Sequence, residues 1–184
     1  MILLLSAILG LALGLLAGGS LARVRSYPLK GLLLPILALL IKAGAAYLLK
    51  PQFGATLVCV LQYALIFLFL SLNYKRPVWP VFAFFGSLGN FLVILLNGGR
   101  MPVSAALIGS GSARLELLAQ NRIYAYCLAG EQTKLPFFGD ILRLGPDGVP
   151  FGFASAGDVL LCVGVLILFI QLVTYMPGKP QAAE

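Results

Sequence analysis

Five long apolar runs dominate the chain, and they cover residues 1–21, 29–49, 54–72, 78–96 and 156–176. Each run is close to the roughly 20 residues that an α-helix needs to cross about 30 Å of hydrocarbon. Short basic or turn-forming stretches separate the first four runs, and a long polar segment precedes the last. The pattern therefore predicts an all-α integral membrane protein, a single membrane domain (1–184) folded as a bundle of about five transmembrane helices.

The segment 97–155 is too polar to lie in a bilayer, and we expect it to cover one membrane face as a long loop. A short helix is predicted over 115–128, because Gly130 is a common C-terminal stop. The sequence Gly145-Pro146-Asp147-Gly148 favours a turn, so residues 141–144 and 149–153 are expected to pair as a small hairpin. The charged residues of the segment are Arg100, Arg114, Glu116, Arg122, Glu131, Lys134, Asp140, Arg143 and Asp147.

Composition supports a membrane protein and removes several classes of function. The chain is 60% hydrophobic and only 10% charged, whereas about a quarter of the residues of soluble domains are charged. A net charge of +7 is typical of nucleic-acid binding in a soluble protein, but these basic residues flank apolar runs, so we exclude nucleic acid. There is no histidine, and Cys59, Cys127 and Cys162 form no CxxC pair. We therefore expect neither a metal nor a cofactor.

Lysine and arginine in the short loops predict the orientation, because they favour the cytoplasmic side. The loops after the first and third runs and the C-terminal tail are basic, whereas the loop after the second run has only Lys50. This places the N-terminus outside, the C-terminus in the cytoplasm and segment 97–155 outside. The first run has no positive n-region, so we expect it to be retained and not cleaved. The cytoplasmic basic residues are Arg23, Arg25, Lys30, Lys75, Arg76 and Lys179.

Small residues recur every four positions along the first run. Ser6, Gly10, Gly14 and Gly18 share one helix face, and such a face lets two helix backbones approach closely in lipid. Packing within the chain is the interpretation we favour, with homodimerisation as the alternative. A similar face on the fourth run makes that run a candidate neighbour of the first, through Ala83, Gly86, Ser87 and Asn90.

The candidate ligand-binding residues are Lys42, Asn90, Asn97, Arg100, Asp140 and Asp158. Polar residues gather in the predicted outer half of the membrane or in the segment above it, namely Lys42, Gln62, Asn97, Arg100, Asp140 and Asp158. A charge inside a span is costly unless it has a partner, a ligand or a route to the interface. A one-sided polar cluster is typical of a pocket open to the outside, whereas a conduction path needs polar groups at all depths.

Structural roles stay open for each of these residues. Lys42 has a stem long enough to reach the interface. Ser155 and Asp158 have the spacing of a capping box. Asn90 and Asn97 are seven residues apart and can hydrogen-bond between helices. Arg100 and Asp140 lie beside glycines, which also make turns.

Three hypotheses of function follow from this distribution. The first is binding or transport of an anionic or amphipathic small molecule, such as a lipid headgroup, in the outward pocket. The second is an accessory or structural subunit that holds a membrane partner through the small-residue face of the first run. The third, which we favour least, is a lipid-modifying enzyme with Asp140 or Asp158 as general base and Arg100 on a phosphate.

Several motifs of the sequence resemble a known family. Asn97-Gly98-Gly99 is followed by Met101-Pro102-Val103-Ser104, then by the step Gly139-Asp140 and by Gly157-Asp158-Val159 at the start of the last run. This pattern is similar to a family of small bacterial multi-pass membrane proteins known only as a domain of unknown function. The resemblance implies a bacterial plasma-membrane protein of about this size, and it implies no activity.

Overall fold

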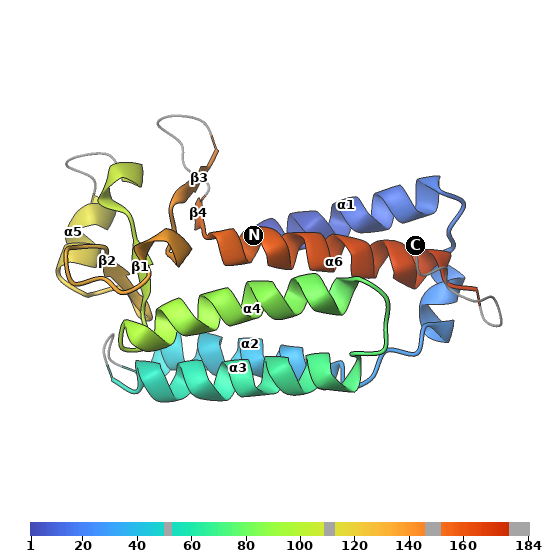
Figure 1. Cartoon of the computed structure of the whole chain (residues 1–184), viewed down its shortest axis with the longest axis horizontal. Coiled ribbons are helices and arrows are strands. Elements are labelled where there is room, and N and C mark those ends of the chain that lie inside the picture. Colours follow the sequence, from blue (N-terminus) through green and yellow to red (C-terminus); the bar gives the residue numbers. More distant parts are fainter. Residues whose placement is uncertain (50–52, 109–112, 146–151, 177–184) are drawn as a thin grey trace.

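The computed structural model describes residues 1–49, 53–108, 113–145 and 152–176. Five apolar helices form its long axis: α1 (Ile2–Leu16), α2 (Leu33–Leu48), α3 (Ala55–Leu72), α4 (Trp79–Leu96) and α6 (Ala156–Thr174). Their directions alternate along the chain, so α1, α3 and α6 run one way and α2 and α4 run the other way (Figure 1). The predicted helical architecture is therefore confirmed.

Three of these helices, α3, α4 and α6, are long and apolar enough to cross a membrane. The other two are shorter than predicted, with 15 residues in α1 and 16 in α2, or about 23 Å at 1.5 Å per residue. Glycines in the left-handed region cause the shortening, because Gly18 (φ 83°) follows α1 and Gly31 (φ 69°) precedes α2. The structure therefore does not confirm five full-length spans, because α1 and α2 are shorter than predicted.

The apolar helices pack in the order α1, α6, α4, α3, α2, so each contacts its neighbours in that series. Glycines allow the closest approaches. A Cβ on Gly10 or Gly14 of α1 would collide with α6, and a Cβ on Gly86 of α4 would lie 2.6 Å from the Gly157 carbonyl of α6. The prediction that the fourth run neighbours the first is wrong, because α6 lies between them and packs against both.

The described part of residues 97–155, which we call the cap segment, lies across one end of the bundle (Figure 1). Strand β1 (Met101–Val103) pairs in parallel with β2 (Tyr126–Leu128), and β3 (Leu142–Leu144) pairs antiparallel with β4 (Gly152–Ala154). Between them lie η2 (Ala105–Leu107), α5 (Ala113–Ala119) and η3 (Pro136–Phe138). The remaining short helix, η1 (Leu21–Ser26), follows α1 at the opposite end.

The cap segment corrects one prediction and bears out part of another. The helix expected over 115–128 ends at Ala119, because Asn121 (φ 53°) and Ala125 (φ 60°) adopt left-handed conformations that no α-helix continues through. Residues 126–128 are a strand instead. The hairpin expected at 141–153 is present as β3 and β4, while residues 146–148 of its turn lie outside the described residues.

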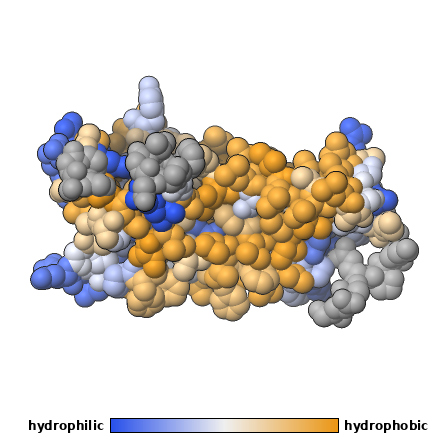
Figure 2. Space-filling model, turned by 90° about the horizontal axis from the view of Figure 1, so that it is seen from above, coloured by the Kyte–Doolittle hydropathy of each residue, from blue (hydrophilic) through white to orange (hydrophobic). Residues whose placement is uncertain are grey.

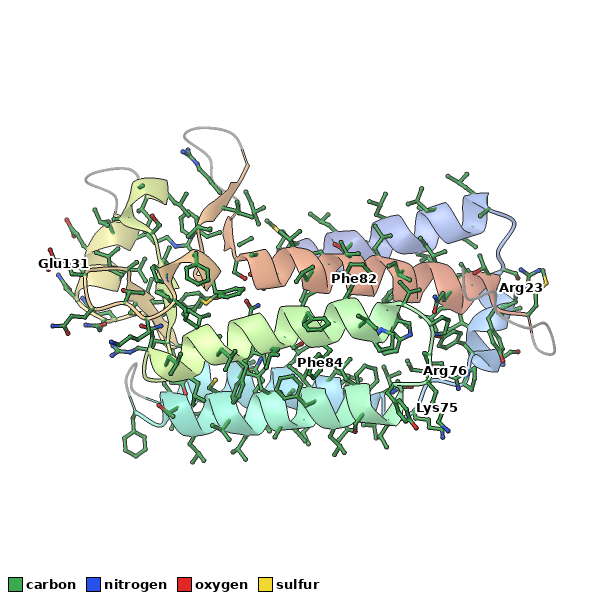
Figure 3. All side chains as sticks on the ribbon, in the orientation of Figure 1. Arg23, Lys75, Arg76, Phe82, Phe84 and Glu131 are labelled. Atoms are coloured by element: carbon green, nitrogen blue, oxygen red, sulfur yellow. The ribbon has the colours of Figure 1, made fainter. Side chains whose placement is uncertain are left out.

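Surface hydropathy separates the two ends of the molecule from its middle. In the face that Figure 2 shows, a broad hydrophobic zone lies over the helices, and hydrophilic residues gather at both ends. Figure 3 places Arg23, Lys75 and Arg76 together at one end and Glu131 of the cap segment at the other. The basic loops after the first and third runs therefore share one end of the bundle.

Candidate functional site

A cavity of about 550 Å³ lies inside the arc of helices and reaches the cap segment. All five apolar helices line it, together with β1, β2, β4 and Asp140. Its lining runs from Trp79 to Ile94 on α4 and from Asp158 to Phe169 on α6, lengths of about 22 Å and about 16 Å at 1.5 Å per residue. The cavity is therefore a long space parallel to the helices.

The two ends of this cavity differ in chemistry. Side chains near the cap segment are polar or charged: Lys42, Gln62, Asn90, Tyr126, Asp140 and Asp158. Those toward the opposite end are apolar or aromatic: Phe69, Leu70, Trp79, Leu168 and Phe169. Such a lining suits a molecule with a polar head and an apolar tail.

The exposed part of the cavity lining lies on α1 and α2. These helices end the packing series and have no extensive contact with each other within the described ranges. Among the residues that line the cavity, the exposed ones belong to these helices, with exposed fractions of 38% for Leu3, 65% for Leu4 and 64% for Leu39. The exposed part of the lining is therefore apolar.

Asp158 belongs to a hydrogen-bonded cluster at the start of α6. The predicted capping box is present, because the Ser155 hydroxyl accepts from the Asp158 amide (2.9 Å) and Asp158 Oδ2 accepts from the Ser155 amide (3.0 Å). Asn90 of α4 joins the cluster by donating to Asp158 Oδ1 (2.8 Å) and accepting from the Ser155 hydroxyl (2.7 Å). Both carboxylate oxygens of Asp158 are thus occupied, and the cluster joins α4 to α6.

Lys42 lines the cavity from α2. Its ammonium nitrogen lies 6.0 Å from the centre of the Tyr126 ring, a cation–π arrangement that supplies only weak stabilisation to an ammonium. In the part of the chain that the structure describes, no ion pair and no hydrogen bond involves the Lys42 side chain. Its charge therefore faces the polar end of the cavity without a strong partner.

Asp140 faces the same end of the cavity from the cap segment. Its backbone is fixed by pairing with β1: its amide donates to the Pro102 carbonyl (2.9 Å), and its carbonyl accepts from the Ser104 amide (3.1 Å). Its side chain is only 5% exposed. No described residue donates a hydrogen bond to its carboxylate.

This environment changes the acidity of Asp140. Burial is the main cause and the negative charge of Asp158 the second, and together they raise the pKa of the Asp140 carboxyl from 3.8 to about 7. The positive charges of Lys42 and Arg114 lower it and do not cancel the rise. The group therefore changes its charge near neutral pH.

Asn97 and Arg100 do not reach the cavity. Asn97 ends α4 and fastens the cap segment, because its amide nitrogen donates to the Lys134 carbonyl (2.9 Å) and its oxygen accepts from the Lys134 amide (3.0 Å). Arg100 donates to the Asn121 side chain (2.8 Å). The structure thus gathers Lys42, Asn90, Asp140 and Asp158 and leaves these two in the framework of the cap segment.

The residues of the small-residue face of α1 also separate in the structure. Gly10 and Gly14 are buried against Leu166, Ile170 and Val173 of α6. No atom of the described residues lies within 4 Å of the Cβ position of Gly18, so this glycine contacts no other helix there. The Ser6 hydroxyl donates to the Ile2 carbonyl (3.0 Å) within α1. The buried part of this face therefore contacts α6 of the same chain.

Three further polar residues at the cavity escaped the sequence analysis as ligand candidates. Tyr126 and Ser87 line the cavity, and Arg114 lies with Asp140 and Tyr126 around a smaller adjacent pocket. The Ser87 hydroxyl is buried without a hydrogen-bond partner among the described residues. Ser87 had a signal, because it is three residues before Asn90 and therefore on the same helix face. The sequence contained no such signal for Tyr126, because its strand was predicted as helix.

Comparisons with known proteins identify the family. The model of one family, described as a family of unknown function (DUF5317), matches residues 26–170. The chain belongs to this family. The expected membership in a family of unknown function is thereby confirmed, and the match includes every cavity residue outside α1. No curated protein and no solved structure matches the chain.

Proposed function

We propose that this member of DUF5317 is a five-span protein of the bacterial plasma membrane that binds or transports an amphipathic small molecule in the cavity. One observation supports it most: Lys42 and Asp140 face the polar end of a long apolar cavity without ion pairs among the described residues. Unpaired charges in a low-dielectric interior are costly. A polar head that contacts both groups offsets that cost.

The proposed topology has the cap segment outside and the C-terminus in the cytoplasm. It is supported by the basic loops, because Arg23, Lys75 and Arg76 gather at the end opposite the cap segment and the positive-inside rule favours that end for the cytoplasm. The short helices α1 and α2 still suit spans, since a bilayer thins locally around a short helix.

The alternative functions have less support. For an accessory subunit, the small-residue face of α1 is the predicted contact, yet Gly10 and Gly14 are covered by α6. For a lipid-modifying enzyme, Arg100 is the predicted phosphate-binding group, yet it lies away from the cavity, and both oxygens of Asp158 are hydrogen-bonded.

The test compares two alanine-to-leucine variants on α2. Ala38 is 1% exposed and lines the cavity, whereas Ala46 is exposed on the same helix. Protein purified in mild detergent is extracted, and the amphiphiles that co-purify are identified and quantified by mass spectrometry. We expect wild type and Ala46→Leu to retain the same molecule. Ala38→Leu should retain at least about fivefold less, because extra methyl groups in a filled space cost about 1–3 kcal/mol.

Two results would count against the proposal. One is wild-type protein that carries no amphiphile and binds none that is added. The other is equal retention by both folded variants, because occupancy would then not depend on the cavity.

A further inference from the structure

We infer that the molecule in the cavity is a membrane phospholipid whose headgroup carries a phosphate and a primary ammonium, as in phosphatidylethanolamine, and that it enters sideways between α1 and α2. This inference rests on the proposed function and names the ligand class of the same site.

Both signs of charge are present at the polar end. Lys42 of α2 and Arg114 of α5 are positive, whereas Asp140 of the cap segment and Asp158 of α6 are negative. A headgroup with a net negative charge satisfies Lys42 but is repelled by Asp140. A headgroup with only a positive charge leaves Lys42 unpaired. A zwitterion provides a partner of opposite charge for each of the two unpaired groups.

The kind of positive group follows from the surroundings of Asp140. An ionised carboxylate only accepts hydrogen bonds, and no described residue donates to this one, although it is 5% exposed. A primary ammonium donates up to three hydrogen bonds, whereas a quaternary ammonium donates none. The Asp140 carboxylate therefore favours ethanolamine over choline, and its pKa falls when the ammonium lies beside it.

The apolar part of the cavity fits a lipid tail from one leaflet. On α6 this part runs from Leu161 to Phe169, about 12 Å at 1.5 Å per residue, which fits within the roughly 15 Å that one leaflet contributes to a hydrocarbon core of about 30 Å. Leu4 and Leu39 line the cavity and are more than 60% exposed, with values of 65% and 64%. A tail can therefore pass between α1 and α2 without crossing a polar surface, while the headgroup stays at the level of the cap segment.

Lipid binding to delipidated, full-length protein tests the inference by native mass spectrometry. The probes are phosphatidylethanolamine, phosphatidylcholine and phosphatidylglycerol with identical acyl chains, and tail-free glycerophosphoethanolamine. We expect phosphatidylethanolamine to bind about tenfold more tightly than the other two lipids, the range of one hydrogen bond to a charged group. Glycerophosphoethanolamine should bind at least about a hundredfold more weakly, because it buries no tail.

Two variants assign the contacts. Asp140→Asn should abolish the preference for ethanolamine over choline, because only the ammonium differs between them. Lys42→Met should weaken both lipids alike, because both carry the phosphate. Lys75→Met is the matched control, since Lys75 lies 5.7 Å from the centre of the Tyr74 ring, much as Lys42 lies beside Tyr126, but at the opposite end of the bundle. It should leave every affinity unchanged.

The outcomes distinguish a failure of the headgroup assignment from a failure of the proposed function. Equal binding of choline and ethanolamine lipids, or tighter binding of phosphatidylglycerol, overturns the headgroup assignment and leaves an amphiphile-binding protein. If glycerophosphoethanolamine binds as tightly as phosphatidylethanolamine, the ligand is not a lipid. Absence of all binding, with nothing co-purified, overturns the proposed function itself. Because wild-type selectivity alone decides the headgroup, a variant that fails to fold does not prevent the test.

Discussion

Replacing Asp140 by asparagine should make the empty protein more stable at alkaline pH while it impairs the site. The folded state raises the pKa of this carboxyl from 3.8 to about 7, so between these values the folded protein holds a proton that the unfolded chain has lost. Stability therefore falls as the pH rises through this window, and the penalty is complete above about pH 7. At 1.36 kcal/mol per pH unit, the difference of about three units corresponds to about 4 kcal/mol.

Asparagine removes the charge but leaves a buried amide that also lacks partners, so we expect about half of this value to be recovered, roughly 2 kcal/mol. For a chain of this size, 1 kcal/mol shifts the melting temperature by about 2–4 °C. Asp140→Asn should thus melt at least about 4 °C above wild type at pH 8.5. At pH 5, about one unit above 3.8, the carboxyl costs only about 2 kcal/mol. The buried amide costs about as much, so the difference should be close to zero there.

The measurement is thermal unfolding of delipidated protein in detergent, followed by the fluorescence of Trp79, the single tryptophan. Glu131→Gln is the matched control, because Glu131 is an exposed carboxylate of the same cap segment, and it should not change the melting temperature at either pH. A stabilisation by Asp140→Asn that is equal at both pH values would refute the assignment of the effect to this carboxyl. So would a lower melting temperature at pH 8.5.

Two further predictions concern the helix packing and the topology. Gly14→Leu should destabilise the protein by about 3 kcal/mol or more, because a Cβ there collides with Val173 and lies 3.1 Å from the Ile170 Cα. Gly44→Leu on α2 should be tolerated, since nothing lies within 4 Å of its Cβ position. Equal melting temperatures of the Gly14→Leu and Gly44→Leu variants would contradict the packing of α1 against α6. In a cysteine-free background, Glu131→Cys should react with an impermeant thiol reagent added outside intact cells and Lys75→Cys should not. The opposite labelling pattern would reverse the proposed orientation.

Much of the fold follows from local sequence properties. Length and hydropathy of the apolar runs locate the five helices, because a helix that satisfies its own backbone is what an apolar environment requires. The capping box of Ser155 and Asp158 is equally local, since its partners are three residues apart. The ends of α1 and α2 are less predictable, because glycine tolerates both helical and left-handed conformations and the sequence does not say which one it adopts at Gly18 and Gly31.

The grouping of the candidate residues needed the tertiary structure. Sequence placed Asn90, Asn97, Arg100 and Asp158 in one half of the molecule, yet Asn97 and Arg100 turn to the cap segment while Asn90 and Asp158 meet at α6. Helical periodicity gives the direction of a side chain relative to its own helix only. Which helix it faces depends on packing, and here the glycines of α1 bring that helix against α6 while Gly157 and Gly164 of α6 bring α4 against it.

By itself the sequence determined the helical architecture, the polar cap segment and the list from which the site is drawn, because these depend on hydropathy and on neighbours within one turn. Only the tertiary structure decided that Lys42 and Asp140 face a common cavity, because they are far apart in sequence and meet through the pairing of Asp140 with β1 and the curved series of helices. The two unpartnered charges identify the site, and the absence of a partner is a property of the whole fold.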